Sequence, residues 1–291
     1  MKEITIISGK GGTGKTTITA AFASLAKNSV MADCDVDAPD LHIILDPRIK
    51  QRLPFYGMKV ALRDETKCTK CGECRKYCRF DAIDEHLNIV DEMCEGCGVC
   101  QYVCREKAIG LLDRISGSII VSETRFGPFV HGELKIAEEA SGKLVTLVKK
   151  KAREVAIEKG MDLIIIDGPP GIGCPAIAAI SGSDLVLAVT EPTVSGAHDL
   201  ARVLNLTDHF GIETVVCINK SSINPDNANK IREFCESQGL DVVGELPYDN
   251  CATKAMVAGM TLIEYTDCPI SNEIRGMWTK IENRLKIGDR G

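Results

Sequence analysis

A glycine-rich loop near the start of the chain is the feature that most narrows the folds available to it. Residues 3–8 (EITIIS) are predicted to form a short apolar strand, and the apolar segment that ends near Lys27 is predicted to form a helix. Between them stands GKGGTGKTT, which satisfies the G-x-x-x-x-G-K-[ST] pattern in the strand–loop–helix context that a P-loop requires. Backbone N–H groups of such a loop converge on phosphate oxygens, and the helix N-terminus adds a favourable dipole. The sequence therefore predicts a nucleoside triphosphate site.

Two side chains of this loop carry the expected chemistry. Lys15 would neutralise the β- and γ-phosphates, and Thr16 would supply a hydroxyl ligand to Mg²⁺. An incidental glycine-rich turn is the alternative, and the order of strand, loop and helix disfavours it. The loop residues expected to bind ATP or ADP are Gly9, Gly11, Gly12, Thr13, Gly14, Lys15, Thr16 and Thr17.

The second half of the chain alternates between strands and helices. Apolar segments predict four further strands, and helix-like segments separate them. Strands that are apolar throughout imply a parallel sheet covered by helices on both faces. We therefore expect a doubly wound α/β domain of the P-loop NTPase type. The four strand candidates are DLIIIDGPP, DLVLAVTEP, TVVCINK and VVGELPY.

The stretch from residue 58 to residue 113 has a different texture, dense in cysteine, glycine and charge and without helical periodicity. Because the α/β pattern stands on both sides of it, we interpret this stretch as an insertion into one domain. The predicted organisation is a discontinuous P-loop ATPase domain at residues 1–57 and 114–291, with an α+β module inserted at residues 58–113.

Eight of the fourteen cysteines fall within the insertion, in two runs of C-x₂-C-x₂-C-x₃-C. Each cysteine of the second run follows its counterpart by 26 residues, as Cys94 follows Cys68. This internal duplication resembles the ferredoxins that hold two [4Fe–4S] clusters, in which the fourth cysteine of each run binds the other cluster. The resemblance implies one cluster on Cys68, Cys71, Cys74 and Cys104, and another on Cys94, Cys97, Cys100 and Cys78.

Other uses of these cysteines fit the spacing less well. Zinc sites typically combine two separated C-x₂-C pairs, which would leave the third and fourth cysteines of each run unexplained. Disulfides are disfavoured in a reducing cytosol, and nothing in the N-terminal segment points to export. The runs depart from the ferredoxin pattern in one respect, because Arg79 and Arg105 stand where a proline usually follows the fourth cysteine.

Outside the insertion, the chain resembles the P-loop ATPase family that includes MinD, ParA, nitrogenase iron protein and the Mrp-type carriers. A second lysine in the loop, Lys10 of KGGTGKTT, carries this resemblance, and DCDVDAPDL and DLIIIDGPPGIG match the two switch regions of the family. In that family the second lysine reaches the nucleotide of a partner subunit. The resemblance implies that ATP binding favours a homodimer and that Lys10 is catalytic across its interface.

The same resemblance assigns roles to further positions. Asp35 would position the attacking water, and Asp167 would hold the hydration shell of Mg²⁺. Asn219 falls where the family contacts adenine, and Pro247 lies in a later matching segment that is expected to line the nucleotide site. Plain structural roles are the alternatives, since an aspartate can cap a strand end and Asn219 can serve as a turn residue. For Asp33, both interpretations remain open.

Composition limits the partners of the chain. Aromatic residues make up 4% of it and its net charge is −6, so neither stacking of single-stranded nucleic acid nor attraction to anionic lipid is expected. No apolar run approaches the roughly 20 residues that span a bilayer, and a cytoplasmic protein is expected. A C-terminal apolar stripe with mixed-charge flanks favours a helix packed on the chain's own sheet over a membrane-binding helix. It consists of Ile274, Met277, Trp278, Ile281 and Leu285.

The hypothesis that unites both sites is an ATPase whose nucleotide state gates electron transfer through two clusters, to a partner protein or to the assembly of a metal cofactor. Two alternatives stay open: a carrier or scaffold for iron–sulfur clusters, and a MinD-like positioning switch with redox-sensing clusters. Cys174 stands just beyond the second switch, near a cluster cysteine of nitrogenase iron protein, but a third cluster there would need a second cysteine per subunit, and none can be assigned in this sequence. The other scattered cysteines are expected to be small buried apolar residues: Cys34, Cys217, Cys235, Cys251 and Cys268.

Overall fold

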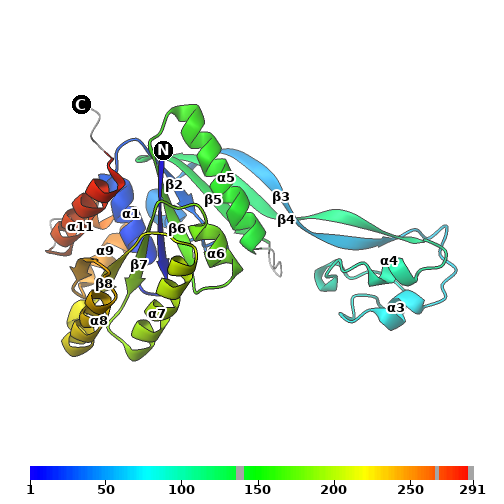
Figure 1. The fold of residues 1–291 in the computed structure, drawn as a ribbon. Coiled ribbons are helices and arrows are strands. Elements are labelled where there is room, and N and C mark those ends of the chain that lie inside the picture. Colours follow the sequence, from blue (N-terminus) through cyan, green and yellow to red (C-terminus); the bar gives the residue numbers. More distant parts are fainter. Residues whose placement is uncertain (136–140, 266–268, 288–291) are drawn as a thin grey trace. The chain divides into compact units, whose positions relative to one another are not determined.

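The computed structural model describes residues 1–135, 141–265 and 269–287 (Figure 1). The chain divides into two compact units. The α/β unit contains Met1–Arg52, Ile119–Glu133 and the chain from Ser141 on, and the cysteine unit contains Leu53–Ser118 and the short stretch that begins at Leu134. The cysteine unit thus starts slightly before residue 58 and ends slightly after residue 113, the limits expected for the insertion.

The strands of the described residues form one sheet in the order β3-β4-β5-β2-β6-β1-β7-β8-β9. Parallel pairing runs from β5 through β2, β6, β1, β7 and β8 to β9. The first strand therefore lies inside the sheet, which confirms the predicted doubly wound topology. The strands are β1 (Lys2–Ser8), β2 (Ser29–Asp33), β3 (Arg48–Arg63), β4 (Ile109–Thr124), β5 (Gly127–Leu134), β6 (Leu163–Pro170), β7 (Leu185–Thr190), β8 (Thr214–Asn219) and β9 (Val242–Leu246).

Helices cover both faces of the sheet in the α/β unit (Figure 1). Successive side chains of a strand point to opposite faces, so Ile6 joins one core cluster and Ile7 joins the other. The first face carries α1 (Lys15–Leu25), α2 (Leu41–Leu45), α9 (Asn250–Val257), α10 (Leu262–Tyr265) and α11 (Pro269–Leu285). The second carries α5 (Ser141–Lys159), α6 (Cys174–Ile180), α7 (Val194–His209) and α8 (Pro225–Ser237), with the 3₁₀ turn Ser221–Ile223 before α8.

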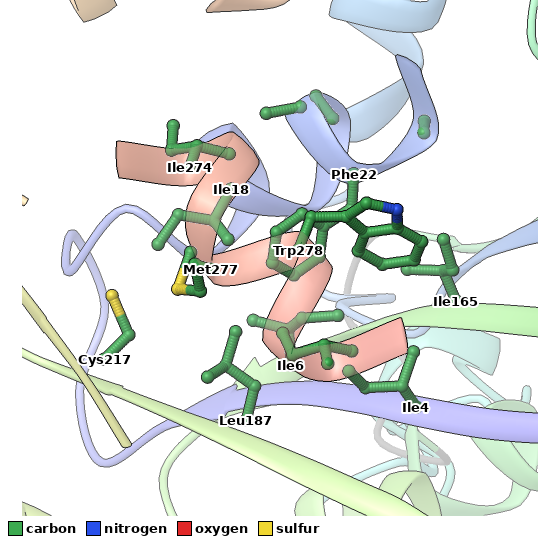
Figure 2. Packing of buried hydrophobic residues seen from close by; sticks show 14 of the residues in the cluster. Ile4, Ile6, Ile18, Phe22, Ile165, Leu187, Cys217, Ile274, Met277 and Trp278 are labelled. Carbon is green, nitrogen blue, oxygen red and sulfur yellow. The ribbon is translucent and has the colours of Figure 1, made fainter. Parts of the chain in front are cut away.

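The C-terminal apolar stripe is buried in the first core cluster, as its spacing predicts (Figure 2). Trp278 of α11 packs against Phe22 of α1, with 4.9 Å between ring centroids. A glycine in β9 makes room for the helix, because a Cβ at Gly244 would stand 2.7 Å from the sulfur of Met277. No helix in the described ranges is both long enough and apolar enough to cross a membrane.

The cysteine unit repeats its backbone as well as its sequence. Its two helices, α3 (Glu73–Tyr77) and α4 (Val99–Val103), stand at the same offset as the two cysteine runs, and a 3₁₀ turn spans Asp91–Met93. Equivalent residues share left-handed conformations, with φ of 58° at Lys70 and 60° at Gly96. The glycines that precede the helices also agree, at 78° and 79°. The duplication seen in the sequence is therefore a structural duplication.

Candidate functional site

The P-loop connects β1 to α1 and depends on glycine for its shape. Gly12 and Gly14 have positive φ angles of 76° and 94°, which side chains of L-residues rarely adopt. A Cβ at Gly14 would also stand 2.3 Å from the amide nitrogen of Asn219. Both the conformation of the loop and the space around it therefore require glycine.

A cavity of about 600 Å³ opens beside this loop. Apolar side chains such as Met256, Leu262 and Ile274 line part of it, while lysine, threonine and aspartate line another part. Such a cavity suits a ligand with an apolar base and a charged tail. Of the residues expected at the nucleotide, those that line the cavity are Gly11, Gly12, Gly14, Lys15, Thr16, Thr17, Asp35, Asn219 and Pro247.

Three residues that were expected at the nucleotide do not line this cavity. Thr13 and Asp167 are buried, with 2% and 1% of their surface exposed. Gly9 packs closely against α7, since a Cβ there would stand 2.3 Å from the Cβ of Asp199. These residues support the wall of the cavity or the loop itself.

The two expected magnesium ligands lie together. The hydroxyl groups of Thr16 and Thr19 both donate to the carboxylate of Asp167, the latter at 3.1 Å. Burial raises the pKa of Asp167, and Lys15 and the two hydroxyl groups oppose that rise. A hydroxyl and a carboxylate are oxygen ligands of the kind that Mg²⁺ prefers, so this donor set fits the ion that accompanies ATP.

Asp33 and Asp35 are only two residues apart but differ in their surroundings. Asp33 is fully buried, and its carboxylate accepts the N–H groups of Asp35 at 3.0 Å and Leu41 at 3.2 Å. Burial and the nearby Asp167 raise the pKa of Asp33. Asp35 lines the cavity, and burial outweighs the attraction of Lys15 and raises its pKa to about 6. The geometry favours the structural interpretation for Asp33, which caps the loop before α2.

Lys10 is held by residues of its own chain. Its Nζ lies 2.6 Å from Oε1 of Glu191. It also donates to the hydroxyl groups of Thr193 at 3.3 Å and Ser195 at 3.0 Å, at the start of α7. This chain therefore engages Lys10 through an ion pair and two hydroxyl groups beside the P-loop.

Glu191 and Lys220 also belong to the site, although sequence reasoning gave them no role. Lys220 donates to the carbonyl oxygen of Gly12 at 2.8 Å and pairs with Glu191 at 3.2 Å. Its neighbour Asn219, expected at the adenine base, donates to the carbonyl oxygen of Thr13 at 2.7 Å. Their position could have indicated the site, because Glu191 directly follows β7 and Lys220 directly follows β8. Ligand sites gather at the carboxyl ends of parallel strands.

The repeated cysteines surround two small cavities in the cysteine unit. Cys68, Cys71, Cys74 and Cys104 line one cavity, and Cys78, Cys94, Cys97 and Cys100 line the other. These are the two crosswise sets that the ferredoxin resemblance implies. Apolar residues that follow each cysteine run lie beside the cavities, with Ala108 and Ile109 at the first cavity and Ala82 and Ile83 at the second.

The chemistry of the cysteines fits an iron–sulfur cluster in each cavity. All eight are free thiols. The N–H of Ala108 donates to Sγ of Cys104 at 3.2 Å, and the N–H of Ala61 donates to Sγ of Cys94 at 3.5 Å. Hydrogen bonds of this kind tune cluster sulfurs. Across the described ranges, no three His, Cys, Asp or Glu side chains converge to hold a single metal ion, and each set of four thiols surrounds a cavity instead.

The scattered cysteines have varied surroundings. Cys34, Cys217 and Cys235 are free and fully buried, as expected. Cys251 is disulfide-bonded and only partly buried, so the expectation of a small buried apolar residue is wrong for it, and Cys268 lies outside the described residues. Cys174 is free and exposed at the start of α6.

Comparison with known proteins relates this architecture to one family. Residues 4–262 match the CobQ/CobB/MinD/ParA nucleotide binding domain. The uncharacterized protein MJ0578 of Methanocaldococcus jannaschii is 35% identical over 284 residues, which covers 96% of each chain. The iron–sulfur cluster carrier protein of Pyrococcus abyssi is 24% identical over 300 residues, which covers 98% of this chain and 86% of that protein.

Solved structures share the fold at lower identity. The septum site-determining protein MinD of Pyrococcus horikoshii, complexed with Mg-ADP, matches with a TM-score of 0.61 and 17% identity, covering 100% of this chain and 99% of that chain. A chain of the MinC:MinD cell division protein complex of Aquifex aeolicus matches with a TM-score of 0.58 and 19% identity, covering 97% of this chain and 96% of that chain. These likenesses establish the architecture of the α/β unit.

Proposed function

Because the chain belongs to the CobQ/CobB/MinD/ParA family of nucleotide-binding proteins, we propose that it is a Mg²⁺-dependent ATPase whose nucleotide state gates electron transfer through two [4Fe–4S] clusters. One observation carries the proposal: two crosswise sets of four cysteines surround two cavities, in the same chain as a P-loop cavity large enough for ATP. A redox partner protein, or the assembly of a metal cofactor, would receive the electrons.

The α/β unit would bind and hydrolyse the nucleotide. Lys15 and the P-loop N–H groups would bind the phosphates, while Thr16 and Asp167 would hold Mg²⁺. Asp35 faces the same cavity, and its pKa of about 6 leaves it largely ionised at neutral pH, where a carboxylate can orient an attacking water. Lys10 would leave Glu191 and reach the nucleotide of a second copy, so ATP would favour the homodimer.

The cysteine unit would hold the clusters. Each cluster would supply one-electron chemistry, at a reduction potential that depends on hydrogen bonds to sulfur and on exposure to solvent. Cys74 and Cys100 are buried, whereas Cys71 and Cys97 are exposed, so each set has an inner and an outer side. The outer cysteines mark where a partner would come closest.

The chain itself supports the coupling between nucleotide and clusters. The loop that carries Asp35 leads through α2 into β3, and the cysteine unit begins within β3 at Leu53. A change in this loop when ATP replaces ADP would therefore act on the strand that enters the cysteine unit. This connection is short and contains little besides α2 and β3.

A cluster carrier is the second candidate, and the similarity to iron–sulfur cluster carrier proteins favours it. In a carrier the clusters would be cargo and would leave for an apo-acceptor protein. In an electron-transfer protein they would stay bound through repeated oxidation and reduction. Transfer of intact clusters to an apo-acceptor therefore separates the two functions.

The test uses anaerobically purified protein reduced with dithionite. Its EPR spectrum is recorded with and without Mg-ATP, beside an iron and sulfide count, and Lys15→Ala serves as the nucleotide-free control. About eight irons per chain, with cluster signals or potentials that ATP shifts only in the protein with Lys15, is the expected result. Eight irons with no response to ATP or ADP would overturn gated electron transfer, and zinc in place of iron would overturn the cluster assignment.

A further inference from the structure

The carbonyl groups of two successive P-loop residues are held by side chains at the end of β8. The amide nitrogen of Asn219 donates to the carbonyl oxygen of Thr13 at 2.7 Å. Nζ of Lys220 donates to the carbonyl oxygen of Gly12 at 2.8 Å. In a planar trans peptide, the carbonyl group of one residue and the N–H group of the next residue point in opposite directions. The N–H groups of Thr13 and Gly14 are therefore turned away from these two side chains.

The direction of these N–H groups matters because the backbone N–H groups of a P-loop hold the phosphates of the nucleotide. Gly12 lines the nucleotide cavity, as Gly14 does. Packing does not restrain Gly12, because a Cβ there would meet no atom of the described residues within 4 Å. Glycine also has more backbone freedom than any other residue. The hydrogen bond from Lys220 therefore supplies a restraint on Gly12 that its surroundings lack.

Lys220 is itself held from two sides. Its backbone N–H donates to Oδ1 of Asn219 at 2.9 Å, and its ammonium group pairs with Oε2 of Glu191 at 3.2 Å. Glu191 directly follows β7, and Thr190 of that strand is paired with Ile218 of β8. The ion pair therefore joins the ends of two neighbouring strands, and strands support a side chain more precisely than loops do.

Lys10 uses the other oxygen of Glu191. Its Nζ lies 2.6 Å from Oε1, whereas Lys220 pairs with Oε2. If Lys10 leaves for the nucleotide of a second copy, as proposed above, Glu191 keeps Lys220 as its counter-charge. The restraint on Gly12 is therefore expected in the single subunit and in the dimer alike.

We propose that Lys220 is a positioning residue of the nucleotide site, which fixes the peptide between Gly12 and Thr13 so that the N–H group of Thr13 points at the phosphates of ADP or ATP. The proposal deepens the proposed ATPase function and rests on it. Lys220 would act through the backbone of the P-loop. Direct attraction between its charge and the phosphates is the competing explanation, since Lys220 also lines the cavity.

The test measures the Kd of Mg-ADP for the oxidised, cluster-loaded protein by calorimetry, because ATP, and not ADP, is expected to favour the homodimer. The variant Lys220→Met removes both the restraint and one positive charge, and its Kd is expected to rise about tenfold or more. The variant Lys220→Met/Glu191→Gln removes one positive and one negative charge, so the net charge beside the P-loop equals that of the parent. We expect it to keep the raised Kd, because it also lacks the restraint on Gly12.

Lys230→Met is the matched control, because Lys230 is an exposed lysine of α8 that does not line the cavity. It is expected to bind Mg-ADP like the parent. The ³¹P resonance of the β-phosphate of bound ADP is a second readout, since a loss of stability alone does not change the environment of a bound phosphate. We expect this resonance to move in both variants that lack Lys220 and to stay in place in Lys230→Met.

Recovery of the parental Kd in Lys220→Met/Glu191→Gln would overturn the proposal, because charge alone would then explain the loss of affinity. An unchanged Kd and an unchanged β-phosphate resonance in Lys220→Met would overturn it as well. A parent protein that does not bind Mg-ADP would instead refute the proposed ATPase, and the positioning role with it. Iron content and the free energy of unfolding are measured for every variant, so a folding defect is recognised.

Discussion

Glu191 holds Lys10, the second lysine of the P-loop, in an ion pair within its own chain. Its carboxylate pairs with Lys10 and with Lys220, and Lys220 holds the carbonyl oxygen of Gly12. The two lysines together lower the pKa of Glu191, although burial opposes that shift. Since the proposed dimer needs Lys10 at the partner's nucleotide, the ion pair with Glu191 opposes association of two subunits.

The change Glu191→Gln is therefore expected to tighten the ATP-dependent dimer roughly fivefold, because a partly exposed ion pair is worth about 1 kcal/mol. Analytical ultracentrifugation with Mg-ATP measures this, in an Asp35→Asn background that is expected to slow hydrolysis. Glu245→Gln is the control, since it removes an ion pair with Arg232 that lies outside the nucleotide cavity. An unchanged or weaker dimer in Glu191→Gln would contradict the argument.

His131 of β5 couples the stability of the α/β unit to pH. It is 2% exposed and stacks on Phe129, with 4.8 Å between ring centroids. Burial lowers its pKa to about 4, although Glu133 at 3.6 Å acts in the opposite direction. An unfolded histidine titrates near pH 6.5. Between these two values the unfolded chain binds a proton that the folded chain does not bind, so stability falls as the pH falls.

As the pH falls from 7.5 to 5, the titration of His131 is expected to lower the free energy of unfolding by about 2 kcal/mol. Over the same pH range, the free energy of unfolding of the variant His131→Gln should fall by about 2 kcal/mol less than that of the parent. Urea unfolding followed by the fluorescence of Trp278, the single tryptophan, gives the values. His198→Gln, whose parent side chain is 73% exposed, should keep the parental pH dependence. Parallel curves for the parent and His131→Gln would refute the assignment.

At the scale of elements, the cysteine unit depends on glycines at particular turns. Gly96 combines a φ of 60° with a close approach to the carbonyl oxygen of Lys59. Gly96→Ala is expected to cost about 2 kcal/mol or more and to lower the iron content per chain. Gly110→Ala in β4 is the control, because a Cβ there meets no described atom within 4 Å. Iron and sulfide counts after anaerobic purification test this, and equal counts in both variants would contradict it.

Helices and strands were predictable where the residues that indicate them lie within one short segment of the sequence. The stripe on α11 and the strand–loop–helix around Lys15 depend on local spacing, and the structure confirms both elements. The long strands β3 and β4 were not foreseen, because their residues alternate irregularly between exposed and buried positions. Helices α3 and α4 span five residues each, too few for a helical period to appear in the sequence.

The candidate site was predictable to the extent that its residues are close in sequence. The resemblance of the cysteine runs to two-cluster ferredoxins implied two crosswise sets, and each set surrounds one cavity in the structure. Glu191 and Lys220 could not be found in this way, because they meet the P-loop only through the order in which β7 and β8 stand beside β1. The open interpretation of Asp33 was likewise decided by two backbone hydrogen bonds that no sequence pattern reveals.

At the scale of the whole molecule, the cysteine unit is inserted into the chain of the α/β unit, so the ribosome completes most of the cysteine unit before the α/β unit. Strands β1 and β2 both pair with β6, and β6 is made only after Leu53–Ser118 is complete. Chains grow at about 5–20 residues per second, and domains fold as they emerge. The cysteines of both sets thus leave the ribosome before Asp167 exists to complete the nucleotide site. Under the proposed function, all eight cluster ligands are therefore present in the nascent chain before it is able to hold Mg-ATP.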